Sequence, residues 1–187
     1  MGVHLLLISG STRPGSTNTA ALRTLQQVVP QGISTHLYNE LTTLPAFVPG
    51  DGPSPPPVAR LRQLLAEADT VLFCTPEYAG LIPGSLKNLL EWTVGTADLH
   101  TKPVAWLTVA TPGRGDGATA SLRTVLGYVG ADIIAPACTR IPILSADVSE
   151  DGTVPNPEIR THLATLAATL SEALAHPEAK PRHPPTP

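Results

Sequence analysis

The stretch Gly10-Ser-Thr-Arg-Pro-Gly-Ser-Thr-Asn18 lies between an apolar run at residues 3–8 and a segment with helical periodicity. The apolar run is too short for a helix and has the length of a strand buried in a parallel sheet. After the stretch, four apolar side chains recur at the spacing of one helix face: Ala21, Leu22, Leu25 and Val28. The sequence therefore predicts a strand, a tight polar loop and a helix, and this order decides the fold.

This loop of glycines and hydroxyl residues has the composition of an anion site. Backbone N–H groups at a helix N-terminus lack intrahelical acceptors, and the helix dipole is positive there. Arg13 adds a guanidinium that can hold two phosphate oxygens. Four further side chains can donate hydrogen bonds: Ser11, Ser16, Thr17 and Asn18. We therefore expect the loop to bind a phosphate group.

The loop departs from two common phosphate motifs. Gly10 and Gly15 have the spacing of the P-loop of nucleoside triphosphatases, but Ser16 stands where that motif has lysine. The dinucleotide fingerprint needs three glycines at a different spacing. A monophosphate held by hydroxyl groups fits best, and the alternative is a Ser- and Gly-rich turn with an ordinary helix cap.

The composition favours one soluble domain. The chain has 187 residues and a net charge of −3 without a basic block, which disfavours nucleic acid as a partner. No apolar run approaches ~18 residues and the first residues lack a leader pattern, so we expect a cytoplasmic protein without a membrane partner. Cys74 and Cys138 lie in apolar contexts and the six histidines are scattered singly, so we expect reduced thiols and no metal site.

Apolar runs and helical patterns alternate along the chain. Further strands are expected at residues 33–38, 70–75, 103–110 and 132–137, the last continuing with an interruption to residue 143. Further helices are expected at residues 58–68, 84–94, 118–129 and 158–174. This alternation predicts an α/β fold: a flavodoxin-like three-layer sandwich, with a five-stranded parallel sheet of order 2-1-3-4-5 and helices on both faces.

Two proline-rich segments interrupt this pattern. Residues 39–57 include Pro53, Pro55, Pro56 and Pro57, which we interpret as a surface loop that enters neither a helix nor a central strand. Residues 177–187 contain five prolines and should be disordered or held only by contacts. We therefore expect one domain at residues 1–175, followed by a Pro-rich tail at residues 176–187.

Two further loops should share the sheet edge with the first. In this strand order the first, third and fourth strands are neighbours at the point where such sheets bind ligands. Pro76-Glu77-Tyr78-Ala79-Gly80 follows the third strand and can aim backbone groups at a flat heterocycle; the alternative is a turn whose tyrosine covers the next helix. Thr111-Pro-Gly-Arg-Gly-Asp-Gly117 follows the fourth strand, and its glycines allow close approach to a planar ring. We expect the three loops to meet in one crevice.

Together these motifs resemble the NADPH-dependent FMN reductase family, which includes quinone, chromate and azo-dye reductases. The resemblance rests on both glycine-containing loops and on a middle motif: Pro76-Glu77-Tyr78, Ile82-Pro83-Gly84, Leu86-Lys87-Asn88 and Trp92. It implies a flavodoxin-like homodimer, in some members a homotetramer, that holds FMN non-covalently and uses NADPH or NADH as co-substrate.

The resemblance also assigns site residues. The FMN phosphate would be held by Ser11, Arg13, Ser16 and Asn18. The isoalloxazine ring would be lined by Pro76, Glu77, Tyr78 and Ala79 and, on its other side, by the loop that contains Thr111, Gly113, Arg114 and Gly115. Family members often have Asn where this chain has Ala79, and Ser where it has Leu81.

The implied activity is hydride transfer from NADPH or NADH through FMN to a small acceptor such as a quinone, free flavin, an azo compound or chromate. The flavin would carry the chemistry, so we expect no catalytic side chain. Backbone N–H groups of residues 113–117 would stabilise reduced flavin, while Arg114 either assists, meets the 2′-phosphate of NADPH, or is solvated. Trp92 fits either a dimer face or the core.

Two alternatives from other classes are a flavodoxin-like electron carrier and a flavin-binding regulator. Carriers of this kind tend to be strongly acidic and to flank the flavin with aromatic side chains. The net charge of −3 and the aromatic content of 4% disfavour the carrier. The replacements at Ala79 and Leu81 motivate the regulator.

Overall fold

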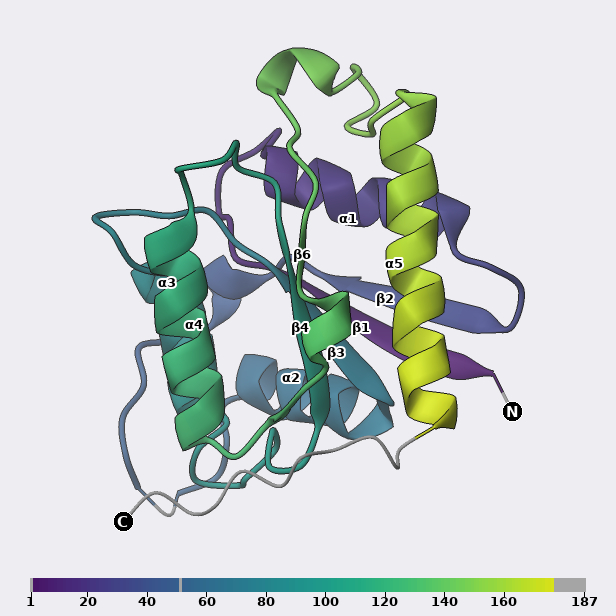
Figure 1. Ribbon diagram of the computed structural model, residues 1–187. Coiled ribbons are helices and arrows are strands. Elements are labelled where there is room, and N and C mark those ends of the chain that lie inside the picture. The colour runs from purple at the N-terminus through teal and green to yellow at the C-terminus, as the bar shows by residue number, and fades with distance from the viewer. Residues whose placement is uncertain (1, 51, 177–187) are drawn as a thin grey trace.

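The computed structural model describes residues 2–50 and 52–176, which form a parallel sheet between two layers of helices (Figure 1). The strands run in the order β2-β1-β3-β4-β5, and β6 pairs with β4 beyond β5. Their bounds are β1 Val3–Ser9, β2 Ile33–Tyr38, β3 Thr70–Cys74, β4 Pro103–Thr108, β5 Asp132–Ile133 and β6 Thr139–Arg140. This is the predicted order, with β6 as an addition.

Alternate residues of the buried strands supply the two cores. Leu6 and Ile8 of β1 face one core, whereas Leu5 and Leu7 face the other. The first core is closed by α2 Pro56–Glu67, α3 Gly84–Trp92 and α4 Asp116–Tyr128. The second is closed by α1 Thr17–Val28 and α5 Pro157–Ala175, which lie together in Figure 1. The predicted three-layer arrangement is therefore confirmed.

One prediction about the proline cluster is wrong. Pro56 and Pro57 do enter a helix, because they form the first turn of α2. Proline is tolerated in the first turn of a helix, because the N–H group that it lacks would have no intrahelical acceptor there. The helix then continues normally, with Ala59 N–H donating to Pro55 O at 2.9 Å.

The last strand is interrupted, but earlier than predicted: the strand expected at residues 132–137 ends at Ile133. β5 pairs with Pro103 and Val104, and the chain then forms a short 3-10 helix at Ala135–Ala137. Pairing resumes in β6, where Thr139 lies opposite Leu107 and Arg140 opposite Thr108. Hydrogen bonds to β4 and the residue after it continue to residue 143, where the Ile143 N–H donates to Val109 O at 2.9 Å.

Trp92 belongs to the core of the chain itself. Its side chain is buried, and Nε1 donates to Pro45 O at 2.9 Å. The ring packs edge-on against Phe47, with the ring centroids 5.0 Å apart. Asn88 adds two hydrogen bonds to the same segment, through Phe47 N–H and Pro45 O. The long connection after β2 is therefore fastened to α3, which favours the core interpretation of Trp92.

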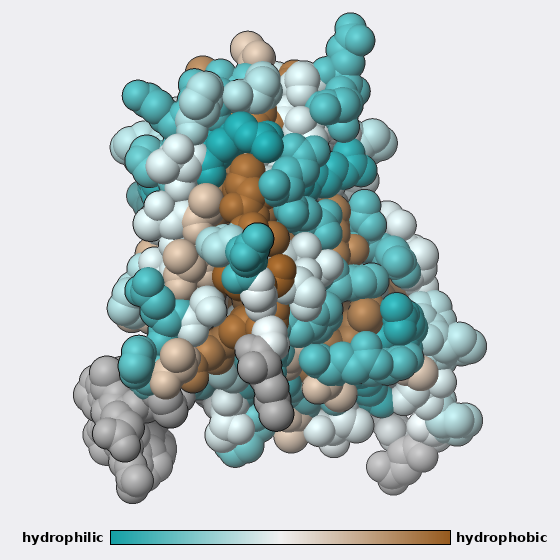
Figure 2. Space-filling model, turned by 90° about the vertical axis from the view of Figure 1, so that its right-hand side faces the viewer, coloured by the Kyte–Doolittle hydropathy of each residue, from teal (hydrophilic) through white to brown (hydrophobic). Residues whose placement is uncertain are grey.

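Figure 2 shows the face that carries α5 and the β2 edge of the sheet. A narrow strip of hydrophobic side chains runs down this face between hydrophilic ones. Among the partly buried side chains packed on the second core are Val28, Val29 and Ile33. Within the described ranges, no helix combines the length and apolar character needed to cross a membrane. The expected tail lies, from residue 177 on, outside those ranges.

Candidate functional site

The loops after β1 and β3 are packed against each other at the carboxyl edge of the sheet. Gly10 N–H donates to Cys74 O at 2.8 Å. A Cβ placed on Gly10 would overlap the Thr75 hydroxyl and would lie 3.0 Å from Leu86 Cδ2. Only glycine therefore fits at this position, and it holds the first loop directly beside the second.

The loops after β3 and β4 are joined in the same way. A Cβ on Gly117 would overlap the carbonyl oxygen of Gly80 and would lie 2.9 Å from the carbonyl carbon. Beside this contact, Glu77 Oε2 accepts a hydrogen bond from Ala118 N–H at 3.0 Å. The Glu77 carboxylate thus caps the N-terminus of α4, where a negative charge is favoured. The three predicted loops are neighbours, and their order along the edge is first, second, third.

The first loop presents free donors at the start of α1. Ser16 is the N-cap, and its Oγ accepts from Asn18 N–H at 3.2 Å. In the part of the chain described here, no acceptor is found for the backbone N–H groups of Thr12, Gly15, Ser16 and Thr17. The side chains of Ser11 and Ser16 are buried beneath them, whereas Arg13 is exposed. These groups form a cradle that suits an anion.

Asn18 lies in the first turn of α1 but its side chain points into the protein. The side chain is buried, its Nδ2 donates to Ser16 Oγ at 3.4 Å, and its Oδ1 accepts from Cys74 Sγ at 3.4 Å. Burial raises the pKa of the Cys74 thiol, so this thiol stays protonated and can donate. Asn18 therefore connects the helix N-cap to the end of β3.

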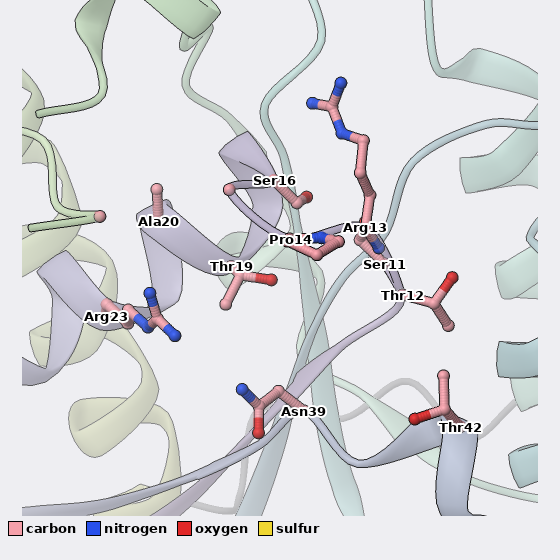
Figure 3. A pocket seen from close by; sticks show the side chains of 12 residues that line it. Ser11, Thr12, Arg13, Pro14, Ser16, Thr19, Ala20, Arg23, Asn39 and Thr42 are labelled. Carbon is pink, nitrogen blue, oxygen red and sulfur yellow. The ribbon is translucent and has the colours of Figure 1, made fainter. Parts of the chain in front are cut away.

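A cavity of about 150 Å³ lies against the first loop on the side of β2. Its walls are residues 11–16 of the loop, Thr19, Ala20 and Arg23 of α1, and three residues from elsewhere: Asn39, Thr42 and Gly152. In Figure 3 the side chains of Arg23 and Asn39 approach the space below Thr19, whereas the Arg13 guanidinium points away from them. The loops after β3 and β4 do not line this cavity, so it is not the crevice between three loops that the sequence predicts.

Arg23 is a cavity residue that the sequence pattern did not reveal. In a helix with an apolar face elsewhere, it has the spacing of an ordinary solvated charge. Its guanidinium lies over Gly152, where a Cβ would come 2.6 Å from Nη1. It makes no hydrogen bond or ion pair with any residue that the structure describes.

The loop after β3 contains a two-residue left-handed turn. Tyr78 and Leu81 exchange backbone hydrogen bonds of 3.0 and 3.1 Å, and Ala79 and Gly80 between them have φ values of 51° and 79°. This is the geometry of a type I′ turn, for which Asn-Gly is the preferred pair. Tyr78 is 54% exposed and Leu81 is 57% exposed, so the turn presents two apolar side chains to solvent.

The glycine loop after β4 is held from below by Arg140. Gly113 and Gly115 both have φ values of 80°, and Arg114 N–H donates to Thr111 O at 3.0 Å. Nη1 of Arg140 donates to three loop carbonyls, at 2.8 Å to Ala110, 3.0 Å to Thr111 and 2.6 Å to Arg114. Arg140 stands outside every motif in the sequence, so pattern alone did not identify it.

The strand order defines a flavodoxin-like α/β protein, and its donor-rich loop lies at the point where such sheets bind ligands. The solved structure of the flavoenzyme NAD(P)H:(acceptor) oxidoreductase of Paracoccus denitrificans has the same fold, with a TM-score of 0.75 and 24% identity over 91% of this chain and 98% of that one. The model of the NADPH-dependent FMN reductase family matches residues 3–140, and the chain belongs to this family.

Curated relatives match a shorter part of the chain. The NAD(P)H-dependent FMN reductase of Pseudomonas aeruginosa is 40% identical over 98 residues, which are 48% of this chain and 49% of the relative. The quinone reductase of Escherichia coli strain K12 is 31% identical over 107 residues, which are 54% of this chain and 57% of the relative. The chain thus spans about half the length of these relatives in the matched region.

Proposed function

We propose that this protein binds FMN and transfers a hydride from NADPH or NADH to a small acceptor: a quinone, free flavin, an azo compound or chromate. The observation that carries the proposal is the first loop, where unpaired backbone N–H groups and buried hydroxyls meet at the start of α1. A phosphomonoester is an anion that such a cradle accommodates. Family membership supports FMN as the molecule that carries it.

The phosphate is assigned to the first loop and the start of α1. Ser11, Ser16 and Thr17 donate through hydroxyl or backbone groups, and Arg13 swings in from solvent. Asn18 acts by holding Ser16 in place, because both ends of its side-chain amide already have partners. Arg23 adds a second positive charge at the cavity wall.

The flavin ring is assigned to the edge where the second and third loops meet. Pro76 and Ala79 contribute backbone, Tyr78 contributes an exposed ring, and Glu77 holds the start of α4. On the other side lie backbone groups of Thr111, Gly113, Arg114 and Gly115. The contacts of Gly10 with Thr75 and of Gly80 with Gly117 support the assignment, since they make this edge continuous with the phosphate loop.

Bound FMN supplies the hydride chemistry, and the chain supplies binding, orientation and charge stabilisation. At the start of α4, the N–H group of Ala118 is taken by Glu77, whereas those of Asp116 and Gly117 have no acceptor among the described residues. These two free donors at the positive end of the helix favour negative charge on a reduced ring. No side-chain acid or nucleophile is required of the protein. We assign selection between NADPH and NADH, and the choice of acceptor, to the exposed rim that includes Arg114 and Tyr78.

We further propose a cytoplasmic homodimer in which two copies meet near the site. The exposed apolar pair Tyr78 and Leu81 supports contact with a second copy, since it stands beside the assigned ring site. The free thiols of Cys74 and Cys138 support a reducing compartment. Sedimentation of the purified protein tests the homodimer, and a monomer at micromolar concentration would contradict it.

One spectrum and one assay test the function. The protein, mixed with FMN and desalted, should retain a yellow flavin spectrum, and addition of NADPH with a quinone should give steady NADPH oxidation. Retained flavin without turnover would support the alternative of an electron carrier, which the net charge of −3 disfavours. Failure to retain FMN would contradict the proposed function and would favour the second alternative, a regulator or an inactive relative, which the replacements at Ala79 and Leu81 motivate.

A further inference from the structure

Arg140 makes a set of contacts that the proposed function does not use. Its Nη1 bonds to the carbonyls of Ala110, Thr111 and Arg114, and its Nη2 pairs with Asp116 Oδ1 at 2.5 Å. All four partners belong to the glycine loop or to the first residue of α4. We propose that Arg140 is a positioning residue, which fixes the backbone of the glycine loop so that its N–H groups face the flavin ring. The proposal rests on the proposed function.

The fold delivers this side chain to one place. β6 resumes pairing with β4 after the 3-10 helix, and this pairing places Arg140 opposite Thr108. Thr108 is only two residues before Ala110, the first of the carbonyls that Arg140 binds. Its side chain is 26% exposed, so the guanidinium is largely enclosed by the loop that it binds. Hydrogen bonds from a charged donor are stronger than neutral ones, and the planar fork of arginine can serve several acceptors at once.

The geometry of the peptide bond turns these contacts into an orientation. In a trans peptide the C=O of one residue and the N–H of the next point in opposite directions. Since the carbonyls of Ala110 and Arg114 face Arg140, the N–H groups of Thr111 and Gly115 face away from it. Across residues 2–50 and 52–176 these two N–H groups have no hydrogen-bond acceptor. Arg140 therefore holds two donors that point away from its own guanidinium and have no acceptor among the described residues, in the loop assigned to the ring site.

The effect is one of orientation and not of charge at the ring. Asp116 balances the guanidinium charge within the same cluster. Two substitutions separate the possibilities: R140M removes charge and fork, whereas R140K keeps the charge and loses the fork. R60M is the matched control, because Arg60 is exposed on α2 and its side chain bonds only to Gln63 among the described residues.

The first experiment measures binding of FMN and of riboflavin, which lacks the phosphate, to the full chain. We expect R140M and R140K to weaken both ligands by the same factor of about ten, and R60M to leave both unchanged. Wild-type affinity in R140M, or wild-type affinity in R140K alone, would overturn the proposal. So would a loss for FMN without a loss for riboflavin, because Arg140 would then act at the phosphate.

The second experiment measures the two-electron potential of the bound flavin. If Arg140 orients donors to the reduced ring, R140K, which keeps the charge beside Asp116, should weaken the reduced form about tenfold more than the oxidised form, which lowers the potential by about 30 mV. An unchanged potential would overturn the proposal.

A third readout needs no flavin. Amide hydrogen exchange of residues 111–117 in the free protein should be faster in R140M and R140K than in R60M, with other segments unchanged. Loose exchange confined to this loop supports the positioning role even if wild-type protein binds no FMN, in which case only the proposed function fails. Unchanged exchange in R140M would overturn the role of Arg140. Faster exchange throughout the chain would also overturn it, by showing a general effect on stability.

Discussion

Replacement of Gly117 by alanine sets two physical effects against each other in one helix. In a helix, alanine is favoured over glycine by about 1 kcal/mol, so helix propensity alone predicts a more stable protein. The new Cβ, however, would overlap the carbonyl oxygen of Gly80 and would lie 3.0 Å from Glu77 Oε2. Backbone cannot yield as a flexible side chain does, and overpacking of this kind costs about 1–3 kcal/mol. We expect the difference between these two effects, so Gly117→Ala should lower the free energy of unfolding by up to about 2 kcal/mol.

Gly127 provides the control, because it lies in the same helix and has no neighbour within 4 Å of an added Cβ. Gly127→Ala should raise the free energy of unfolding by up to about 1 kcal/mol. Urea unfolding with linear extrapolation measures both variants, and FMN titration should show weaker binding for Gly117→Ala only. If Gly117→Ala proves as stabilising as Gly127→Ala, the second and third loops are not packed as described.

Four further predictions concern individual side chains. Ala79→Asn and Ala79→Gly should each raise the free energy of unfolding by about 1 kcal/mol, since Ala79 has a φ of 51°. Urea unfolding measures this change, and a lower free energy of unfolding in both variants would exclude the left-handed turn. Arg13→Ala should weaken FMN about tenfold without affecting riboflavin, and Arg23→Ala should do so less, as measured by calorimetric titration; equal losses for the two ligands would place the phosphate elsewhere. Burial raises the pKa of the Cys74 thiol, and it also raises the pKa of the Cys138 thiol, which is only partly buried. The native thiol of Cys74 keeps its proton, whereas the unfolded thiol ionises above about pH 8.5, so stability should fall as the pH rises beyond that value. Cys74→Ala should weaken this dependence in pH-resolved urea unfolding, and Cys138, whose pKa is also raised, should account for part of what remains. With Ellman's reagent near pH 8 in native protein, Cys138 should react first, and prior reaction of Cys74 would contradict its burial.

Most of the fold could be predicted because strands buried on both faces consist of consecutive apolar residues, which the sequence shows directly. β3 is buried along its whole length and is apolar from Val71 to its end, and β2 has the predicted bounds. The helix expected at residues 58–68 begins two residues earlier, at Pro56, because proline is excluded from helix interiors but accepted in the first turn, and a composition count does not separate the two cases. Local chemistry at a helix start outweighed the general rule.

The candidate site could be predicted where it is formed by the backbone of glycine-containing loops. It could be predicted less well where it depends on side-chain contacts between residues far apart in the sequence. Glycines and hydroxyls marked the first loop, and the strand order placed the three loops together. Glu77, in contrast, bonds to Ala118, and Arg140 bonds to residues some thirty positions earlier. Such contacts follow from the tertiary structure, and no spacing in the sequence announces them. The inward-facing amide of Asn18 is a further case, since its partner Cys74 lies on another strand.

The break in the last strand leaves a place where this chain can change in length. Residues 134–138 lie opposite only Ala105 and Trp106, and pairing is then restored at Thr139. Residues 135–137 form a 3-10 helix, so their side chains do not alternate between the two faces of the sheet. A residue gained or lost in this segment can therefore be absorbed while Arg140 stays opposite Thr108. The same change inside β4 would move every later side chain of that strand to the other face of the sheet.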